Sequence, residues 1–373
     1  MSIVPVTFVP SSFSTNYRHV ALTISGSTHT LYLDGSAVAV NLSGGNMLTY
    51  GSAIPNIYIG CAGDLSYGFT GIIDDFKIWN RALPPVDISA LYYPYFFVYR
   101  FINSFTTSIW LDTCIVSNFV LSGSNVTTWK DKTNNGFELS GNTYGEGTIT
   151  YNSTSPTSLS LYNIFNGNKK AYFIQSATSK NFDMLNPIQT WFWVLSFPVG
   201  SSDLYSYRIA GVQNYDNFGG IDYLIQGNQF FIYSHGTSPG TGIYYNFTPL
   251  SNMKYLFSVS LDASSNNTDN TYAGTITKSI MRLNGNTQTV SSTTANGKYS
   301  LKLGPNRVGK SVSLCIGAIG SGFGSGGNEI YQGNFLFNIH EIIGINNQAL
   351  GIADIRMVET YLNTKWNLGY TIN

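Results

Sequence analysis

Two stretches near opposite ends of the chain share one pattern: FKIWNRALPPVDISALY at residues 76–92 and IIGINNQALGIADIRMVETYL at residues 342–362. They align without a gap at a single offset (345 − 78 = 267), which pairs Ile78, Asn80, Ala82, Leu83, Asp87 and Ile88 with Ile345, Asn347, Ala349, Leu350, Asp354 and Ile355. An ungapped match of this kind indicates an internal repeat. The sequence therefore predicts two modules that close in the same way.

Each stretch follows a similar order of strand-like segments. In the first copy these are RHVALTI (18–24), HTLYLDG (29–35), NIYIGCAG (56–63) and FTGIIDDFKIWN (69–80), in which Ile73, Phe76 and Ile78 are candidate core residues. In the second they are IMRLNGN (280–286), LCIGAIG (314–320) and NFLFNIHEIIGIN (334–346). Asp34-Gly35 and Asn284-Gly285 are turn signals. A helix of one or two turns is predicted over 86–91, and a short helical tail over 349–366, where apolar residues recur every three or four positions.

The segment between the two copies, 109–279, alternates apolar and polar residues and is punctuated by turns. Its strand-like runs include WFWVLSF (191–197), IDYLIQ, QFFIYSHG and KYLFSVSLD. Short alternating strands with frequent turn residues are typical of a β-sandwich. We therefore expect an all-β fold whose only helices are short turns at the end of each module.

The residues also resemble a known family. YLDG, IYIG and the stretch 69–92 resemble the closing half of a concanavalin A-like, laminin-G-like jelly roll. The stretch 108–140 looks like the opening of a related module, with a WLD strand at Trp110–Asp112 and a W-x-D-x-T-x-N-G turn at Trp129–Gly136. Its closing pattern is present as Glu341–Ile345, Ala349-Leu350, Tyr361-Leu362 and Lys365-Trp366. The resemblance implies two sandwich modules, and it leaves function open because this fold carries lectins, hydrolases, adhesion modules and virion proteins.

The first module has only its closing half. We expect a partial laminin-G-like sandwich at 1–95, a linker at 96–107 and a complete concanavalin A-like sandwich at 108–373. A half-sandwich exposes a sheet face and strand edges. Three explanations stay open: a reduced sheet packed within its own chain, a partner chain that completes the sandwich by adding strands, or truncation of a longer precursor.

Composition excludes some classes of partner. Nineteen basic residues balance nineteen acidic ones, and only 10% of residues are charged. A nucleic-acid-binding surface is basic, so no nucleic acid is expected. The most apolar stretch, 92–102, is too short to span a bilayer and contains Arg100, so no membrane span is expected. A weakly charged, neutral surface favours packing into an assembly.

The acidic residues, histidines and cysteines show no pattern that indicates an enzyme. Glycoside hydrolases on this fold place carboxylates at alternate positions of one strand, whereas Glu138, Glu146, Glu329, Glu341 and Glu359 are scattered. Asp74-Asp75 is interpreted as a turn or edge pair. The four histidines and three cysteines show no metal-ligand spacing. We expect a protein that is not an enzyme.

Two loops are candidate ligand sites. QNYDNFGGID (213–222) offers Asp216, Asn217 and Asp222 as oxygen ligands beside Tyr215, an arrangement suited to a sugar site that uses calcium. DASSNNTDN (262–270) is a weaker candidate, and a polar turn is the simpler interpretation of both loops. Trp191 and Trp193 share one strand face, where core packing is favoured over a sugar platform.

These observations predict a structural protein of a large assembly, without a required cofactor. By analogy with the modules it resembles, it would be a minor capsid or capsid-surface protein of a large DNA virus, located in the virion and bound to other subunits. The alternative is a lectin-like adhesin, extracellular or at a cell surface, that binds glycan with or without calcium.

Overall fold

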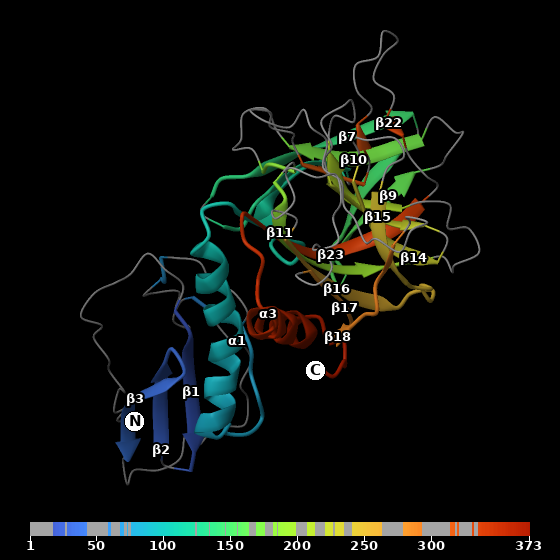
Figure 1. Cartoon of the computed structure of the whole chain (residues 1–373). Coiled ribbons are helices and arrows are strands. Elements are labelled where there is room, and N and C mark those ends of the chain that lie inside the picture. The colour runs from blue at the N-terminus through green and yellow to red at the C-terminus, as the bar shows by residue number, and fades with distance from the viewer. Residues whose placement is uncertain are drawn as a thin grey trace. The chain divides into compact units, whose positions relative to one another are not determined.

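The structure is a computed structural model of the 373-residue chain. It describes residues 18–26, 28–42, 59–60, 68–70, 73, 76–123, 125–133, 135–145, 147–154, 156–163, 169–175, 182–184, 186–198, 207–212, 221–226, 228–234, 241–262, 279–292, 314–317, 319–320, 330–331 and 335–373. The chain divides into two compact units, residues 1–99 and 100–373 (Figure 1). Within the described ranges, no helix has the length and apolar character needed to cross a membrane.

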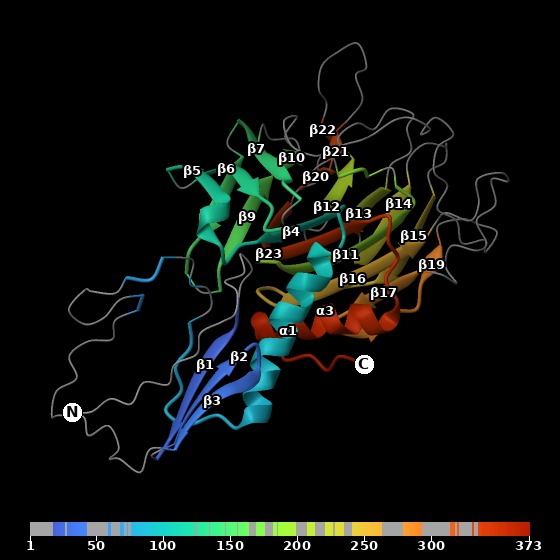
Figure 2. The same ribbon diagram turned by 90° about the vertical axis from the view of Figure 1, so that its left-hand side faces the viewer.

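The N-terminal unit contains a three-stranded antiparallel sheet. Its strands are β1 (Val20–Ser25), β2 (Thr28–Leu33) and β3 (Ser36–Leu42), with β2 in the centre (Figure 2). The predicted Asp34-Gly35 turn joins β2 to β3 and has positive φ angles of 53° and 77°. These angles match the two-residue hairpin turn that the sequence indicated.

Helix α1 (Pro85–Asn103) packs its first turns against one face of this sheet. Tyr32 of β2 forms a small buried cluster with Leu83 and Ile88. The hydroxyl of Ser89 donates a hydrogen bond of 2.9 Å to the carbonyl oxygen of Gly35. A Cβ atom at Gly35 would lie 2.8 Å from the ring of Tyr92, so this turn needs glycine for space as well as for its φ angle.

Two predictions for this unit were wrong. The described residues of 69–80 form no strand, and the candidate core residues Ile73, Phe76 and Ile78 are exposed by 49, 54 and 62%. Helix α1 is also much longer than one or two turns; it continues into the expected linker 96–107, within which the boundary between the two units falls. Val98 and Ile102, one helical turn apart, are fully buried, and this apolar spacing accounts for the continued helix.

The C-terminal unit is a β-sandwich, which confirms the predicted fold class. One sheet has the order β18 (Asn286–Thr287), β17 (Ile280–Leu283), β16 (Lys254–Asp262), β11 (Ile188–Ser196) and β23 (Phe335–Asn346). The two halves of β23 then pair with β4 (Ser108–Asp112) and with β9 (Ser158–Asn163), and β9 pairs with β8 (Thr148–Asn152).

The other sheet is formed mostly by the middle of the chain. Its order is β19 (Ser291–Ser292), β15 (Thr241–Asn246), β14 (Gln229–Ser234), β13 (Ile221–Gln226), β12 (Tyr207–Val212), β20 (Leu314–Ile316), β10 (Lys169–Gln175), β7 (Glu138–Gly145), β6 (Asn125–Lys130) and β5 (Phe119–Ser122). A short 3₁₀ helix, η1 (Val116–Asn118), precedes β5, and β21 (Ile319–Gly320) pairs with β22 (Ile330–Tyr331).

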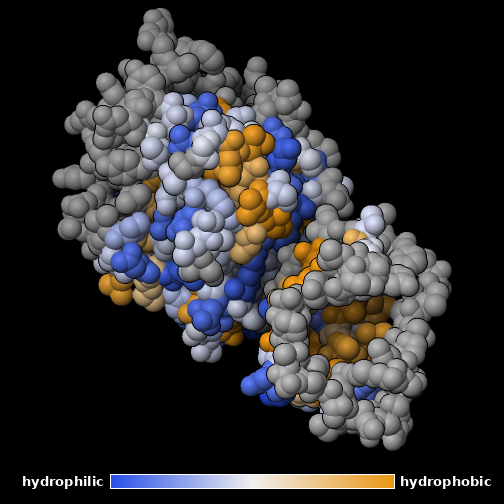
Figure 3. Space-filling view, turned by 180° about the vertical axis from the view of Figure 1, so that it is seen from behind, coloured by the Kyte–Doolittle hydropathy of each residue, from blue (hydrophilic) through white to orange (hydrophobic). Residues whose placement is uncertain are grey.

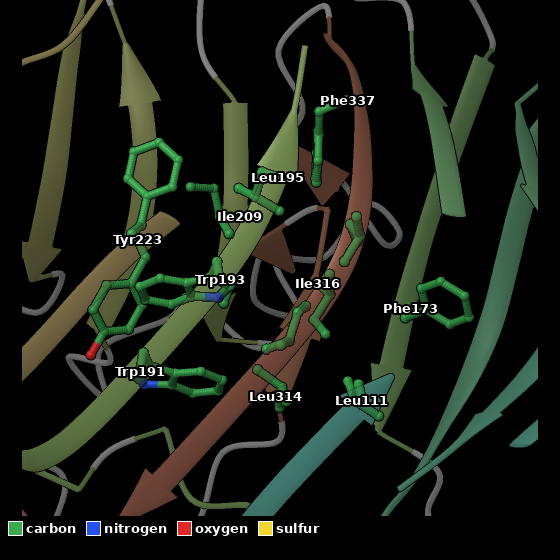
Figure 4. Close-up of a cluster of buried hydrophobic side chains, with 14 of the residues drawn as sticks. Leu111, Phe173, Trp191, Trp193, Leu195, Ile209, Tyr223, Leu314, Ile316 and Phe337 are labelled. Carbon is green, nitrogen blue, oxygen red and sulfur yellow. The ribbon is translucent and has the colours of Figure 1, made fainter. Parts of the chain in front are cut away.

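The core lies between the two sheets (Figure 4). Trp191 and Trp193 of β11 point into it, are fully buried, and stack with their ring centroids 5.4 Å apart. They contact Tyr223 of the opposite sheet. The interpretation of both tryptophans as core residues is confirmed, so neither is available as an exposed sugar platform.

Helix α3 (Ile352–Lys365) covers the outer face of the first sheet. Phe192, Val194 and Ile343 point away from the core between the sheets, yet they are fully buried. The helix residues Val358 and Leu362 face the sheet, and no more than 1% of either is exposed. The helix therefore adds a third layer and a second apolar interface to this unit.

The internal repeat is visible in the positions of the two helices. Helix α1 begins at Pro85 and α3 at Ile352, which are separated by the offset of the aligned sequences (352 − 85 = 267). The paired positions Leu83 and Leu350, like Ile88 and Ile355, are buried in their respective units. The repeat therefore encodes a common closing helix, although the strand before it is present only in the second copy among the described residues.

Candidate functional site

The predicted ligand loop lies only partly within the described residues. Tyr215, Asp216 and Asn217 are outside them. Asp222 is the second residue of β13, where it is fully buried and pairs with Tyr233 of β14. Its neighbours Ile221 and Tyr223 face the core, so alternation directs Asp222 to the opposite face. The structure thus does not test whether these four residues act together.

The strands do show which segments meet at one edge of the sandwich. Val212 and Leu314 are cross-strand partners, as are Ile221 and Ser234, and Ser234 pairs in turn with Thr241. In the sequence, residues 213–220, 235–240 and 293–313 connect these strand ends and Ser292. The strand ends that flank these three polar, glycine-containing segments therefore lie side by side at this edge.

A buried cluster of charged side chains lies on the outer face of the first sheet, the face that α3 covers and that points away from the core between the sheets. Asp112 of β4 and Glu341 of β23 are direct cross-strand partners, and each side chain is no more than 1% exposed. The Lys365 Nζ atom lies 2.5 Å from Oδ2 of Asp112 and 3.0 Å from Oε2 of Glu341. Lys132 Nζ contacts the same Oδ2 atom at 2.9 Å and lies 4.2 Å from the ring centre of Trp110.

Indole and phenol groups complete the shell around Glu341. Trp110 Nε1 donates to Oε1 at 2.6 Å, Trp366 Nε1 donates to Oε2 at 2.5 Å, and the Tyr361 hydroxyl lies 3.3 Å from Oε1. Burial raises the pKa of Glu341, although Lys365 opposes the shift. Burial also acts to raise the pKa of Asp112, but the two lysines outweigh it, so its pKa is well below the ordinary range.

In the sequence these residues are recognisable only as parts of family-like motifs. No chemistry was predicted for the WLD strand, for Lys132 or for the closing Lys365-Trp366, and Glu341 is one of several scattered acidic residues. Asp112 and Glu341 are brought together only by the pairing of β4 with β23, which no local pattern reveals. Because lysine side chains contact both carboxylates and the cluster is buried, Asp112 and Glu341 do not line an open catalytic cleft.

A β-bulge beside this cluster directs His340 to the same face as Glu341. The register between β11 and β23 shifts so that Val194 pairs with Glu341 but Leu195 pairs with Ile339. His340 Nδ1 lies 2.8 Å from the carbonyl oxygen of Thr157, so Nδ1 donates and Nε2 accepts from the Ser196 hydroxyl at 3.0 Å. Burial lowers the pKa of His340 to about 4, which keeps the ring neutral at neutral pH.

A second buried ion pair holds α3 to the sheet. The guanidinium of Arg282 in β17 contacts both carboxylate oxygens of Glu359, at distances of 3.0 and 3.1 Å from Nε. Both side chains are no more than 1% exposed. Arg282 also donates to the Thr287 hydroxyl at 2.8 Å, so the pair is hydrogen-bonded on several sides.

The W-x-D-x-T-x-N-G turn is a structural hydrogen-bond centre. Oδ1 of Asp131 accepts from the backbone N–H groups of Trp110, at 2.6 Å, and Thr133, at 3.0 Å. The amide of Asn135 donates to the carbonyl oxygen of Ser108 at 2.8 Å. Burial raises the pKa of Asp131 to about 6 despite these bonds. The motif ties the turn after β6 to the start of β4.

Metal binding finds no support in the described part of the chain, where no three His, Cys, Asp or Glu side chains gather in a way that would hold an ion. The candidate calcium ligands Asp216 and Asn217 fall outside that part. Calcium binding therefore stays a prediction.

Comparison with known proteins adds a family match at the N-terminal end of the chain. Residues 6–89 match the model of the concanavalin A-like lectin/glucanases superfamily. This match bears out the resemblance of the first module to laminin-G-like domains. None of the curated proteins matches the chain.

Solved structures similar to this chain include receptor-binding domains of botulinum neurotoxins. The binding domain of neurotoxin DC in complex with rat synaptotagmin II has a TM-score of 0.42 at 13% identity, over 70% of this chain and 52% of that one. The same binding domain in complex with SialylT has a TM-score of 0.44 at 12% identity, over 72% and 53%. A structure of botulinum neurotoxin type C, whose cell entry depends on interaction with two ganglioside molecules, has a TM-score of 0.42 at 14% identity, over 73% of this chain and 53% of that one. The chain thus spans about half the length of these structures.

Proposed function

We propose that the C-terminal sandwich binds glycan through residues 213–220, 235–240 and 293–313. The observation that carries this proposal is that the strand ends flanking these segments, which include Val212, Ile221, Ser234 and Thr241, lie side by side at one edge of the sheet. Loops held together at one end of a rigid sandwich are the usual position of binding residues on such folds. The match to the concanavalin A-like lectin/glucanases superfamily covers residues 6–89 of the N-terminal unit and is in keeping with a glycan-binding chain, but it does not reach these segments.

The composition of 213–220 suits a sugar ligand. Tyr215 supplies a ring for the apolar face of a pyranose, and Asp216 and Asn217 supply oxygen atoms for hydroxyl groups. The same oxygens are suitable ligands for calcium, which we propose as an accessory ion that holds the loop in its binding conformation. Asp222, buried at the base of the loop, would act by supporting it, since its side chain is not at the surface.

We infer that the protein is a binding protein and not an enzyme. Among the described residues, four carboxylates are almost fully buried, and three of them, those of Asp112, Glu341 and Glu359, contact lysine or arginine. Carboxylates engaged in this way cannot flank a glycosidic bond as free acid and nucleophile. For a glycan-binding protein of this kind we propose an extracellular or cell-surface location.

A glycan array probed with the full chain, in calcium and again with a chelator, tests the proposal. We expect binding to one glycan class that is reduced by the chelator and abolished by the double substitution Asp216→Ala and Asn217→Ala. The matched control is Asn166→Ala, in the segment between β9 and β10, which should leave binding intact. No binding on the array, or equal loss in the control, would contradict the proposal.

A second candidate function, a subunit of a larger assembly such as a viral capsid, is favoured by the sheet of the N-terminal unit. Val20, Leu22 and Ile24 line one face of β1 and are exposed by 64, 56 and 42%. Leu33 and Leu31 of β2 lie opposite the first two, so the apolar surface continues across the sheet. Hydrophobic surface is visible on this unit in Figure 3. A contiguous apolar face of this kind favours coverage by another subunit.

Self-association of the full chain tests the assembly function. If this face is an interface, Leu22→Ser should shift the chain toward monomer in light scattering after size-exclusion chromatography. Leu250→Ser is the control, because Leu250 is comparably exposed at 60% but lies in the C-terminal unit. A wild-type chain that stays monomeric at all concentrations, together with an unchanged Leu22→Ser variant, would contradict an assembly through this face of β1.

A further inference from the structure

The buried Asp112–Lys365–Glu341 cluster brings together the three groups needed for a covalent cross-link. We propose that Lys365 and Asp112 form an intramolecular amide (isopeptide) bond, with Glu341 as the group that moves the proton. The bond would join the first strand of the C-terminal unit, β4, to the last turn of its closing helix, α3.

The geometry places the amine next to the carbon that it would attack. Lys365 Nζ is 2.5 Å from Oδ2 of Asp112, and Oδ2 is one bond from Cγ. Reacting groups held in van der Waals contact with fixed orientation gain a large effective concentration, which makes condensation of an amine with a carboxyl feasible without an activated intermediate. Asp112 cannot turn away, because its Oδ1 atom accepts a 2.9 Å hydrogen bond from the backbone N–H of Cys114.

Glu341 is positioned to serve both reactants. Its Oε2 atom lies 3.0 Å from Lys365 Nζ, on the same amine that contacts Asp112. The indoles of Trp110 and Trp366 hold its carboxylate in place through hydrogen bonds of 2.6 and 2.5 Å. Burial raises the pKa of Glu341, which suits a carboxylate that must accept a proton and release it again.

The step balances without any added reagent. The ammonium of Lys365 passes a proton to Glu341, and Glu341 passes it on to Oδ2 of Asp112, so the neutral amine attacks Cγ of a protonated carboxyl. Oδ1 carries the developing negative charge at the Cys114 N–H group. Oδ2 then leaves as water after it takes a second proton from nitrogen. One ammonium and one carboxylate thus become one amide and one water molecule.

Lys132 and the burial of the cluster favour formation of the amide. Lys132 Nζ lies 2.9 Å from Oδ2, the oxygen that leaves, and remains as the cation that balances Glu341 afterwards. Conversion of a buried ion pair to an amide removes two charges from a region where charges are costly to desolvate. The Lys365 side chain keeps 18% of its surface exposed, which gives the released water a short route out.

Intact-mass spectrometry of the purified full chain tests the proposal. We expect a mass lower than that of the sequence by one water molecule, and a proteolytic map that contains a branched peptide joining Asp112 to Lys365. The variant Lys365→Arg keeps the positive charge but cannot form this bond, so it should show the full sequence mass. Glu341→Gln should also show the full mass while retaining the folded near-ultraviolet circular dichroism of the sandwich.

The remaining outcomes overturn the proposal or its assignment. A wild-type chain of full sequence mass, with separate peptides for Asp112 and Lys365, would show that the cluster is an ion pair only. A branch at Lys132 would contradict the choice of amine, and Lys132→Arg is expected to retain the loss of water. Loss of water without any branched peptide would indicate a cyclic imide elsewhere and would also overturn the proposal.

Discussion

Asp112 and Glu341 lie directly opposite each other on β4 and β23, and the single amine of Lys365 contacts both carboxylates. Two buried carboxylates on one sheet face would repel each other unless positive charge and hydrogen-bond donors surrounded them. The lysines and indoles that surround them belong to the sequence patterns at the two ends of this unit. Those patterns therefore encode closure of the sandwich and not a surface binding site.

The indole hydrogen bond from Trp366 to Glu341 should be measurable in stability. We expect Trp366→Phe to lower the free energy of unfolding by about 1.5–3 kcal/mol more than Trp129→Phe does, because only the former removes a hydrogen bond to a carboxylate. Trp129 is also buried, and its Nε1 atom has no hydrogen-bond partner among the described residues. Urea unfolding followed by far-ultraviolet circular dichroism provides the comparison. Equal losses in the two variants would contradict the role given to Trp366.

The Arg282–Glu359 pair should be costly to break on one side. Glu359→Ala leaves a guanidinium that is 1% exposed without its carboxylate, so we expect a loss of about 3–5 kcal/mol in the free energy of unfolding. Lys130→Ala, at an exposed position of β6, is the control and should change stability by no more than about 0.5 kcal/mol. Chemical denaturation monitored by tryptophan fluorescence measures both. A small effect at Glu359 would indicate that water reaches the pair.

Acid should destabilise the fold through His340. Its folded pKa is about 4, against 6.5 for an ordinary histidine, so between these values the unfolded chain binds more protons than the folded one. The stabilising contribution of His340 is complete above about pH 6.5 and is lost as pH falls toward 4, by up to about 3 kcal/mol.

Asp131 acts in the opposite direction. Its pKa in the folded chain is raised to about 6, so its contribution to the free energy of unfolding decreases as pH rises through 6.

The variant His340→Gln isolates the histidine contribution. Its unfolding free energy should fall less steeply than that of the wild type between pH 6.5 and pH 4, while the slope due to Asp131 stays the same in both proteins. Denaturation curves at closely spaced pH values give the two slopes. Parallel slopes would mean that His340 is protonated in the folded state at its ordinary pKa.

Gly344 packs closely against Trp191, so a larger residue at this position is unfavourable. A Cβ atom at position 344 would lie 2.5 Å from the indole ring of Trp191, its cross-strand partner. We expect Gly344→Ala to cost about 1–3 kcal/mol through overpacking. The smaller ring in Trp191→Phe leaves space for the added methyl group, so the double variant should be less destabilised than the sum of the single variants. Strict additivity in thermal or chemical unfolding would contradict this contact.

The sequence was most informative where local patterns decide structure. The strands of 280–346, the turns at Asp34-Gly35 and Asn284-Gly285, and the start of both closing helices were predicted because turn chemistry and apolar spacing are local properties. The prediction of a strand at 69–80 was wrong. The aligned segment in the second copy, β23, forms a strand because it pairs with β11, β4 and β9. Apolar alternation alone does not supply such neighbours.

The site was harder to predict for the same physical reason. The contact between Asp112 and Lys365 joins residues whose separation in sequence is 253, and it depends on the register of β4 and on α3 lying over the sheet. Spacing along the chain carries no information about such a contact. The interpretation of Trp191 and Trp193 as core residues was confirmed, because alternation within a single strand was sufficient for it.

The most direct test of the proposed glycan site is a calorimetric titration of the glycan that gives the strongest array signal. The wild-type chain is compared with a variant in which residues 213–220 are replaced by a glycine-serine loop of equal length, and with a second variant in which residues 164–168 are replaced in the same way. The proposal predicts saturable binding to the wild type and to the 164–168 variant, and none to the 213–220 variant. Undiminished binding by the 213–220 variant would contradict it.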